Sequence, residues 1–320
     1  MQTMEKEYFL RIITEICQEN DIKIINLDNK RICILSYNGI EKIIWSKKFE
    51  LNSVTSTKIA DNKSSTYQVL HQKNIPCIEY KRYNGYYREG VLCLGDSSLE
   101  DINNDLVKYS QMVIKPDNGY EGVDVYRIKK LSDISYYSKK FNSQYKYICT
   151  SPYYQIKNEY RTICLNGTAL LSYKKTLPFV VGNGIDNVER LIQLEFKSNA
   201  LKYINQLTKD EKKYIPKLNE EINISWKFNL SQGAESTNIE DENLLYLIQQ
   251  LSLKAANAIH INFSSVDVIE TVNGAFLIME INSGVVINKF IDHDPSNYKI
   301  AKSIYKKAIF SMFNKSGNDR

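Results

Sequence analysis

The stretch SVDVIETVNGAFLIMEIN, residues 265–282, is the strongest structural signal in the sequence. Two apolar runs flank Asn273-Gly274, a pair typical of a tight hairpin turn. Glu280 and Asn282 are two residues apart, so on a strand they point to the same face. Asp267 lies on the neighbouring strand and can join them. The opposite face is predicted to be buried by five apolar side chains: Val266, Val268, Ile278, Met279 and Ile281.

Two carboxylates and an amide oxygen on one sheet face form a hard-oxygen site, which suits Mg²⁺ bound together with nucleotide phosphates. A solvated polar face is the alternative interpretation. The apolar residues predicted for the other face favour the metal site, because they leave the acids aimed at a shared side.

A lysine-glycine segment, VIKPDNGYEGVDVYRI, covers residues 113–128. Lys115 ends an apolar strand, and Gly119 and Gly122 lie in the loop before the returning strand. Such a loop can place an ammonium group and backbone N–H groups over phosphate oxygens. A hairpin tip that only happens to carry glycine and lysine is the alternative. The sequence contains neither the P-loop pattern nor the dinucleotide-binding glycine pattern.

Further charged groups lie between these segments. Arg161 begins the apolar strand EYRTICL, where an arginine is costly unless it meets an anion; a structural pair with Glu159 is the alternative. Lys174 and Lys175 precede an apolar run, and a later segment supplies hydrogen-bonding groups. That segment, WKFNLSQGA, contains Asn229, Ser231 and Gly233.

Composition limits the classes of protein to consider. The chain has 320 residues, a formal net charge of +5 and 43% hydrophobic residues, which suits two or three ordinary globular subdomains. Charges are mixed and no apolar run is long enough to span a membrane, so we predict a cytoplasmic protein that binds neither nucleic acid nor membranes. The six cysteines form no CxxC pair, which favours reduced, buried thiols. The three histidines have no serine or cysteine partner pattern that would indicate a nucleophilic triad.

The order of elements predicts an α+β protein. An amphipathic helix over residues 1–20 precedes three Ile-rich strands, at 22–28, 31–38 and 41–46. Residues 52–62 are polar and Ser/Thr-rich and indicate a connection between subdomains. The remaining predicted helices are 64–73, 97–109, 131–141, 187–196, 241–260 and 298–313. The remaining predicted strands are 75–83, 111–117, 123–128, 145–154, 159–165, 168–176, 264–271 and 275–282.

In order, the pieces IADNKSSTYQVLHQKNIPCIEY, VIKPDNGYEGVDV, NEYRTICLNG, KKTLPFVVGNG, NLSQGA, SVDVIE and MEIN resemble the ATP-grasp superfamily. The similarity covers about residues 53–315. It is strongest to cyanophycin synthetase, to the ATP-grasp part of bifunctional glutathione synthetases and to ligases that add glutamate tails to a ribosomal protein. The resemblance implies two α+β subdomains that clasp ATP, over residues 53–147 and 148–316. A small reduced N-terminal α/β subdomain covers 1–52, and 317–320 form a tail.

The resemblance also implies roles for residues. Lys63 and Lys115 match the phosphate-binding lysines, with Asn62 where the family has an acid before the first lysine. The closing loop matches Asp117 to Gly122, with Gly119, Tyr120 and Gly122 near the phosphates. The adenine-binding linker matches Cys149 to Tyr153, where Thr150, Ser151 and Tyr153 stand and the usual glutamate is absent. Catalytic positions match Arg161, Lys175, Asn229 and Ser231, and the metal ligands match Asp267, Glu280 and Asn282.

The activity implied is an ATP- and Mg²⁺-dependent carboxylate–amine ligase, with Mn²⁺ as a substitute metal, that works through an acyl phosphate. Its substrates would be amino acids or peptides. Two alternatives stay open: modification of a ribosomal peptide or of an acyl group on a carrier protein, and a nucleotide-binding protein without activity. Many relatives are oligomeric, so the resemblance further implies a homodimer. The sequence does not identify the two substrates.

Overall fold

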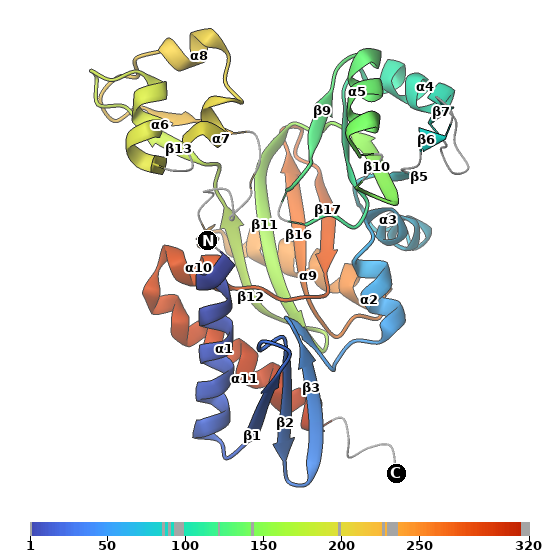
Figure 1. Cartoon of the computed structure of the whole chain (residues 1–320), viewed down its shortest axis with the longest axis vertical. Coiled ribbons are helices and arrows are strands. Elements are labelled where there is room, and N and C mark those ends of the chain that lie inside the picture. The colour runs from blue at the N-terminus through green and yellow to red at the C-terminus, as the bar shows by residue number, and fades with distance from the viewer. Residues whose placement is uncertain are drawn as a thin grey trace. The chain divides into compact units, whose positions relative to one another are not determined.

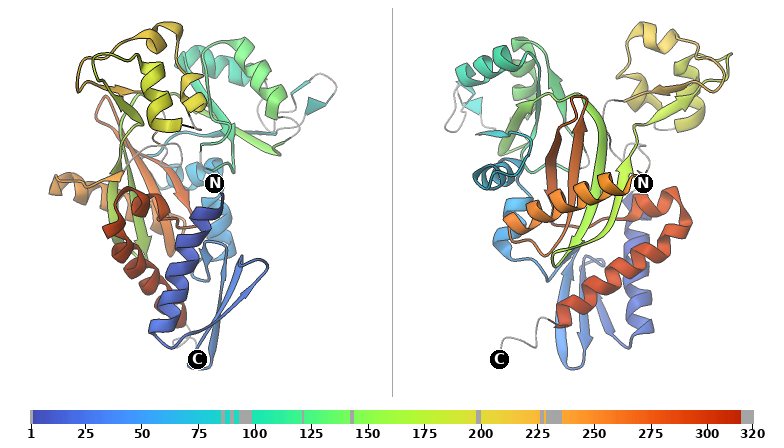
Figure 2. Two further views of the ribbon diagram at one scale, coloured as in Figure 1. Left: turned by 60° about the vertical axis from the view of Figure 1, so that its left-hand side comes forward. Right: turned by 180° about the vertical axis from the view of Figure 1, so that it is seen from behind.

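The computed structural model divides the chain into two compact units: Met1–Tyr173 with Asn238–Arg320, and Lys174–Thr237. Figures 1 and 2 show the chain from three directions. The structure describes residues 2–84, 87–88, 91–92, 99–120, 122–141, 144–197, 200–225, 228 and 236–314.

The N-terminal part of the first unit is an antiparallel sheet covered on one face by the first and last helices of the chain. The sheet has the order β1-β2-β3-β4, and α1 and α11 lie beside it in Figure 1. Phe9 of α1 packs edge-on against Tyr305 of α11, and Lys302 of α11 donates hydrogen bonds to Glu15 and Glu19 of α1. The bounds are α1 Gln2–Glu19, β1 Lys23–Leu27, β2 Ile32–Tyr37, β3 Ile40–Trp45, β4 Lys48–Phe49 and α11 Tyr298–Asn314.

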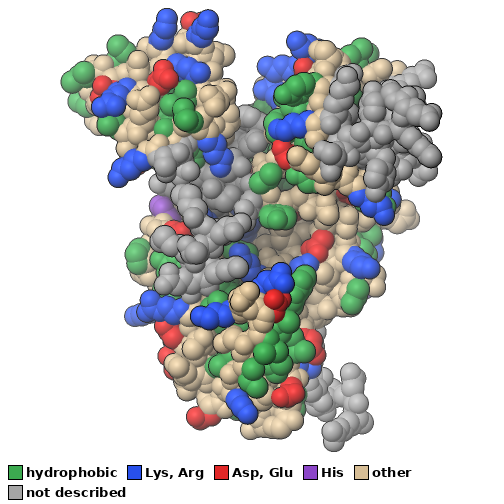
Figure 3. Space-filling view, viewed as in Figure 1, with side chains coloured by type: hydrophobic (Ala, Val, Ile, Leu, Met, Phe, Trp, Pro, Cys, Tyr) green, Lys and Arg blue, Asp and Glu red, His purple; other side chains and the backbone are tan. Residues whose placement is uncertain are grey.

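The other face of this sheet carries apolar side chains that no described helix covers. Two cross-strand rows form it: Ile25, Ile34 and Ile43 in one, and Leu27, Ile32 and Trp45 in the other. Of these, Ile25, Leu27, Ile43 and Trp45 are exposed. Figure 3 shows the hydrophobic side chains gathered over these strands.

The central sheet of the first unit is built from long antiparallel strands in the order β12-β11-β16-β17. Helix α9 packs across its rear face (Figure 2, right), and Ile248 and Ala255 of α9 join Val266, Ile278 and Ile281 in one core. The bounds are β11 Ile156–Leu165, β12 Thr168–Lys175, α9 Glu242–Ala258, β16 Phe263–Thr271, β17 Phe276–Asn282, α10 Asn288–His293 and the 3₁₀ helix Pro295–Asn297.

A second antiparallel sheet, in the order β5-β10-β8-β9, is covered by α4 and α5. Its core joins Tyr83, Ile114 and Ile148 from the strands to Ile102 and Phe141 from the helices. Two further helices, α2 and α3, precede this sheet in the chain. The bounds are α2 Val54–Ala60, α3 Lys63–Gln72, β5 Lys81–Asn84, β6 Tyr87–Arg88, β7 Val91–Leu92, α4 Leu99–Tyr109, β8 Met112–Pro116, β9 Tyr126–Ile128, α5 Leu131–Phe141 and β10 Tyr147–Pro152.

The second unit has its own small core. Val180 and Ile224 pack there with Val188, Ile192 and Tyr203 of the helices. Strand β13 pairs with β14, and β15 pairs with the end of β12 at Lys174 and Lys175. The bounds are β13 Phe179–Val181, α6 Val188–Phe196, α7 Ala200–Ile204, α8 Lys209–Lys213, β14 Glu221–Asn223 and β15 Ser236–Thr237.

The predicted α+β class and most predicted elements are confirmed, with two differences. Most of the polar connection 52–62 is helix α2, which Ser53 caps by accepting a hydrogen bond from the backbone N–H of Ser56. The strand predicted for 75–83 begins only at Lys81. Before it, Cys77 forms an isolated parallel bridge with Ile278 at the edge of the central sheet. Among the described residues, the helices are too short or too polar to cross a bilayer.

Candidate active site

Three charged residues form one row across the central sheet. Arg161 of β11 pairs with Asp267 of β16, and Asp267 pairs with Glu280 of β17. Directly paired residues of antiparallel strands point to the same face. Asn282, paired with Ser265, follows Glu280 by two positions and points to that face as well. The prediction that Asp267, Glu280 and Asn282 share one face therefore agrees with the register.

A β-bulge interrupts β17 beside this row. Asp267 pairs with Glu280, but the next residue, Val268, pairs with Ile278, so Met279 is an extra residue. Ile278 and Ile281 both reach the α9 core, whereas Met279 packs with Leu277 and Ile269 on the other side. The sequence interpretation that placed Met279 on the buried rear face was wrong, because strict alternation does not hold across a bulge.

Arg161 and Asp267 form a bidentate pair. Nε donates to Oδ1 at 2.7 Å and Nη2 donates to Oδ2 at 2.6 Å. The Asp267 side chain is 3% exposed, and that of Arg161 is 19% exposed. Burial alone would lower the pKa of Arg161, but the nearby charges of Asp267 and Glu159 hold that pKa well above its usual value. The arginine therefore meets the predicted metal ligand directly, and the charge of Glu159 also raises its pKa.

Lys63 lies between the central sheet and the glycine loop. Its Nζ is 3.4 Å from Oε1 of Glu280 and donates a 2.6 Å hydrogen bond to the carbonyl oxygen of Gly119. The Lys63 side chain is 7% exposed. An ammonium group in this position can compensate anionic charge on either side of it.

Asp117, the first residue of the glycine loop, fixes the start of helix α3. Its carboxylate accepts hydrogen bonds from the backbone N–H of Ser64 at 2.9 Å and from the Ser64 hydroxyl at 2.6 Å. Its carbonyl accepts from the backbone N–H of Lys63. The N-cap residue itself, Asn62, makes no side-chain cap bond. A carboxylate from another segment therefore caps the helix that carries Lys63.

Lys115 reaches the central sheet through a tyrosine. Its Nζ donates to the Tyr80 hydroxyl at 3.0 Å and lies 4.6 Å from the centre of the Tyr80 ring. The Tyr80 hydroxyl donates in turn to the carbonyl oxygen of Met279, the bulge residue. Burial raises the pKa of Tyr80 well above its usual value, so this tyrosine stays protonated.

The glycine loop has two positions that favour glycine. A Cβ atom at Gly119 would lie 3.1 Å from Cβ of Pro116, and Gly122 has a φ of +64°. Tyr120, between them, is exposed. The structure does not describe Glu121.

The predicted adenine linker is largely a strand. Thr150 pairs with Ile114 on one side and Lys81 on the other, and Ser151 pairs with Val113. Both side chains are buried. Tyr153 follows the strand and its ring lies 3.8 Å below the Arg127 guanidinium.

An apolar cluster continues the site face beyond the charged row. Ile269 and Leu277 form the next cross-strand pair, and Ile78, Tyr80 and Cys149 pack on them from the second sheet and the segment before it. Met279, Tyr67, Tyr154 and Ile156 pack against the same cluster. Burial raises the pKa of the Cys149 thiol to about 12, so it is an inert apolar neighbour. One face thus has a charged end and an apolar end.

Comparison with solved structures decides the fold. A bifunctional glutathione synthetase from Pasteurella multocida superposes with a TM-score of 0.53 at 16% identity, over 90% of this chain and 44% of that chain. D-alanine–D-alanine ligase from Bacillus anthracis gives 0.54 at 12% identity, over 82% and 72%, and its complex with ATP gives 0.50. This chain has the ATP-grasp fold. It spans less than half the length of that glutathione synthetase. No family model matches the sequence, and no curated protein matches it.

The ATP-grasp chain offers a donor set that fits magnesium. Asp267, Glu280 and Asn282 provide two carboxylates and an amide oxygen on one face, the hard oxygen donors that Mg²⁺ prefers. In the described part of the chain, no group of three or more His, Cys, Asp or Glu residues could hold a metal. A site with only two acids leaves ligand positions for phosphate oxygens and water.

Two residues near this candidate site were missed from the sequence. Asp61 stands one residue before Asn62 and accepts hydrogen bonds from Lys48 and from the Ser283 hydroxyl. Tyr80 links Lys115 to the bulge, as described above. No local sequence pattern marks Asp61 or Tyr80, because their contacts are with residues far along the chain. Asp61 does supply an acid close to the position where the family has one.

Three predicted residues belong to the second unit. Lys175 lies at the end of β12, where it pairs with Ser236 and is buried. Asn229 and Ser231 lie outside the described residues. Their predicted roles stay predictions.

Proposed function

We propose that the protein is an ATP-dependent ligase that joins a carboxylate to an amine through an acyl phosphate. The observation that carries the proposal is the row of Arg161, Asp267 and Glu280, with Lys63 held between Glu280 and the glycine loop. The ATP-grasp fold supports it, because fold neighbours include a glutathione synthetase and a D-alanine–D-alanine ligase. Fold alone does not fix an activity, so the residues of the row carry the argument.

The proposed reaction has two steps. A carboxylate oxygen of the first substrate attacks the γ-phosphorus of ATP, and ADP leaves with the bridging oxygen. The amine of the second substrate then attacks the acyl carbon, loses a proton, and phosphate leaves with the electrons of the broken C–O bond. The products are an amide, ADP and phosphate.

Charge compensation is the task of the chain's own residues. The first step brings a carboxylate up to a polyphosphate, so like charges must be held together. Lys63 and Lys115 would bind phosphate oxygens, and Arg161 would stabilise the transferring phosphoryl group. Asp267, Glu280 and Asn282 would hold Mg²⁺, which supplies further positive charge to the phosphates when bound. The half-buried side chains of Leu277 and Met279 would offer apolar surface for the adenine ring.

Water must be kept from the acyl phosphate, which it would hydrolyse. The glycine loop at Asp117–Gly122 is the segment proposed to cover the phosphates. Its root is fixed, because Asp117 is bound to Ser64 and Lys63, while Tyr120 is exposed. A loop whose first residue is fixed can close over the phosphates without losing its register.

The test is turnover with defined pools. The purified protein is incubated with ATP, Mg²⁺ and pools of amino acids and short peptides; ADP and phosphate are assayed, and condensed products are identified by mass spectrometry. Glu280→Ala should lower turnover about 100-fold or more, as expected when a ligand of the metal that stabilises transition-state charge is lost. Glu195→Ala changes an exposed glutamate of the second unit and is the matched control. Full turnover by Glu280→Ala would contradict the proposal.

The finer substrate assignment is part of the same proposal. Amino acids or peptides as substrates, a small peptide or carrier protein as partner, a homodimer and a cytoplasmic location are predictions from the sequence. Products formed only with peptides would favour peptide modification over the joining of free amino acids. ADP binding without turnover on any pool would favour a nucleotide-binding protein that is not an enzyme.

A further inference from the structure

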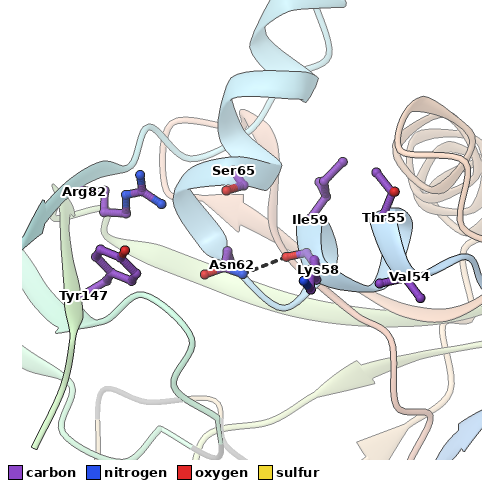
Figure 4. Close-up of a pocket in the computed structure, with 8 residues that line it drawn as sticks. All are labelled: Val54, Thr55, Lys58, Ile59, Asn62, Ser65, Arg82 and Tyr147. Atoms are coloured by element: carbon purple, nitrogen blue, oxygen red, sulfur yellow. Dashed lines mark hydrogen bonds between the residues drawn. The ribbon is translucent and has the colours of Figure 1, made fainter.

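A cavity of about 420 Å³ lies beside the start of helix α3, apart from the charged row. Figure 4 shows Arg82 and Tyr147 on one side, residues of α2 on the other, and Asn62 and Ser65 between them. None of the residues predicted to hold nucleotide or metal lines it. The eight lining residues are Val54, Thr55, Lys58, Ile59, Asn62, Ser65, Arg82 and Tyr147.

The charge of this cavity is positive. Lys58 and Arg82 are both exposed, and the eight lining residues include no aspartate or glutamate. Within the described residues, neither cation forms an ion pair with an acid. Two cations that no described carboxylate pairs with favour a negatively charged ligand.

The walls are held in place. The Arg82 guanidinium lies over the Tyr147 ring, 4.7 Å from its centre, which restrains the arginine. The Asn62 side chain donates a 2.7 Å hydrogen bond to the carbonyl oxygen of Lys58 and so ties the end of α2 to the start of α3. A preorganised site loses less conformational entropy when its ligand binds.

Backbone hydrogen bonds connect both walls of the cavity to the first residue of the glycine loop. The backbone N–H of Asp117 donates to the carbonyl oxygen of Tyr147, and the carbonyl of Asp117 accepts from the N–H of Lys63, the neighbour of Asn62. A ligand in the cavity would therefore lie at the root of the loop proposed to cover the phosphates.

We propose that this cavity binds a carboxylate-bearing substrate, namely an acidic amino acid or an acidic residue of a peptide. The proposal rests on the ligase function proposed above and names its substrate class. Arg82 can bind a carboxylate through two parallel N–H groups, and Lys58 adds a second charge from the opposite wall. Val54, Ile59 and the Tyr147 ring provide apolar surface for the aliphatic stem. The volume is within the range of small-molecule sites, roughly 300–1,000 Å³.

The test is a calorimetric titration of the full chain with the dipeptide L-glutamyl-L-glutamate, without nucleotide or metal. We expect saturable binding that Arg82→Gln and Lys58→Gln each weaken about tenfold, or about 1.4 kcal/mol. Lys254→Gln, which changes an exposed lysine of α9, is the matched control and should bind as the wild type does. Titration of each variant with ADP and Mg²⁺ checks that the chain is folded.

Three results would overturn the inference. The first is that the dipeptide shows no saturable binding. The second is that Arg82→Gln and Lys58→Gln bind the dipeptide as tightly as the wild type does. The third is that inorganic phosphate binds in an Arg82-dependent way and the dipeptide does not displace it. In each case ADP binding and the Glu280→Ala assay would still report on the ligase proposal, so the two failures are distinguishable.

Discussion

Glu280 and Lys63 form an ion pair that a bound nucleotide would have to open. Phosphates that bind Lys63 without Mg²⁺ must displace Glu280 and would then face its uncompensated charge. With Mg²⁺ present, the carboxylate gains the metal while the lysine gains the phosphate. We therefore expect Mg²⁺ to strengthen ADP binding to the wild type by about tenfold or more, or about 1.4 kcal/mol, measured by calorimetry.

Glu280→Gln should change the affinity for ADP in opposite directions without and with Mg²⁺. Without Mg²⁺, the variant should bind ADP more tightly than the wild type, because Lys63 has lost its partner. With Mg²⁺, it should bind ADP more weakly, because a metal ligand is lost. Glu195→Gln is the control. An equal loss of affinity with and without Mg²⁺ would show that Glu280 acts only through the structure.

The three predicted metal ligands could be placed on one face because strand alternation is a local property. Asp267, Glu280 and Asn282 follow from period two and one tight turn. Met279 and Tyr80 could not be predicted. The bulge occurs where Ile278 bonds to Pro76, and the Tyr80 hydroxyl reaches the Met279 carbonyl across 199 positions of sequence. No periodicity encodes such distant contacts.

At the scale of single elements, helix α3 depends on a cap from outside its own segment. Asp117→Ala removes two hydrogen bonds and leaves the buried Ser64 donors without their acceptor. The free energy of unfolding should fall by about 2 kcal/mol, measured from the urea midpoint at constant slope.

Asn62→Ala is the matched control, because the N-cap side chain makes no cap bond and the change removes an exposed hydrogen bond to the carbonyl oxygen of Lys58. It should lower the free energy of unfolding by no more than about 1 kcal/mol. A larger loss for Asn62→Ala than for Asp117→Ala would mean that the local N-cap residue stabilises the helix.

Helix α2 explains why some elements escape prediction. Its sequence, VTSTKIA, is rich in β-branched residues, which have low helix propensity. The Ser56 hydroxyl donates to the carbonyl oxygen of His260, so a partner far along the chain helps to hold the helix. Helices α1 and α11 could be predicted without knowledge of distant contacts, because the spacing of their apolar residues alone indicates a buried face.

At the scale of the whole molecule, the second unit should open on its own. It comprises 64 residues, Lys174–Thr237, and packs its own core around Ile192. A unit of this size has a stability of only about 3–10 kcal/mol, and an Ile→Ala change at a buried site costs about 2–5 kcal/mol. Ile192→Ala should therefore remove much of the hydrogen-exchange protection of residues 174–237, while the central strands β11, β16 and β17 keep theirs. Ile185→Ala, at an exposed position of the same unit, should leave both patterns unchanged. Loss of protection in both units with Ile192→Ala would mean that the chain unfolds as one cooperative body.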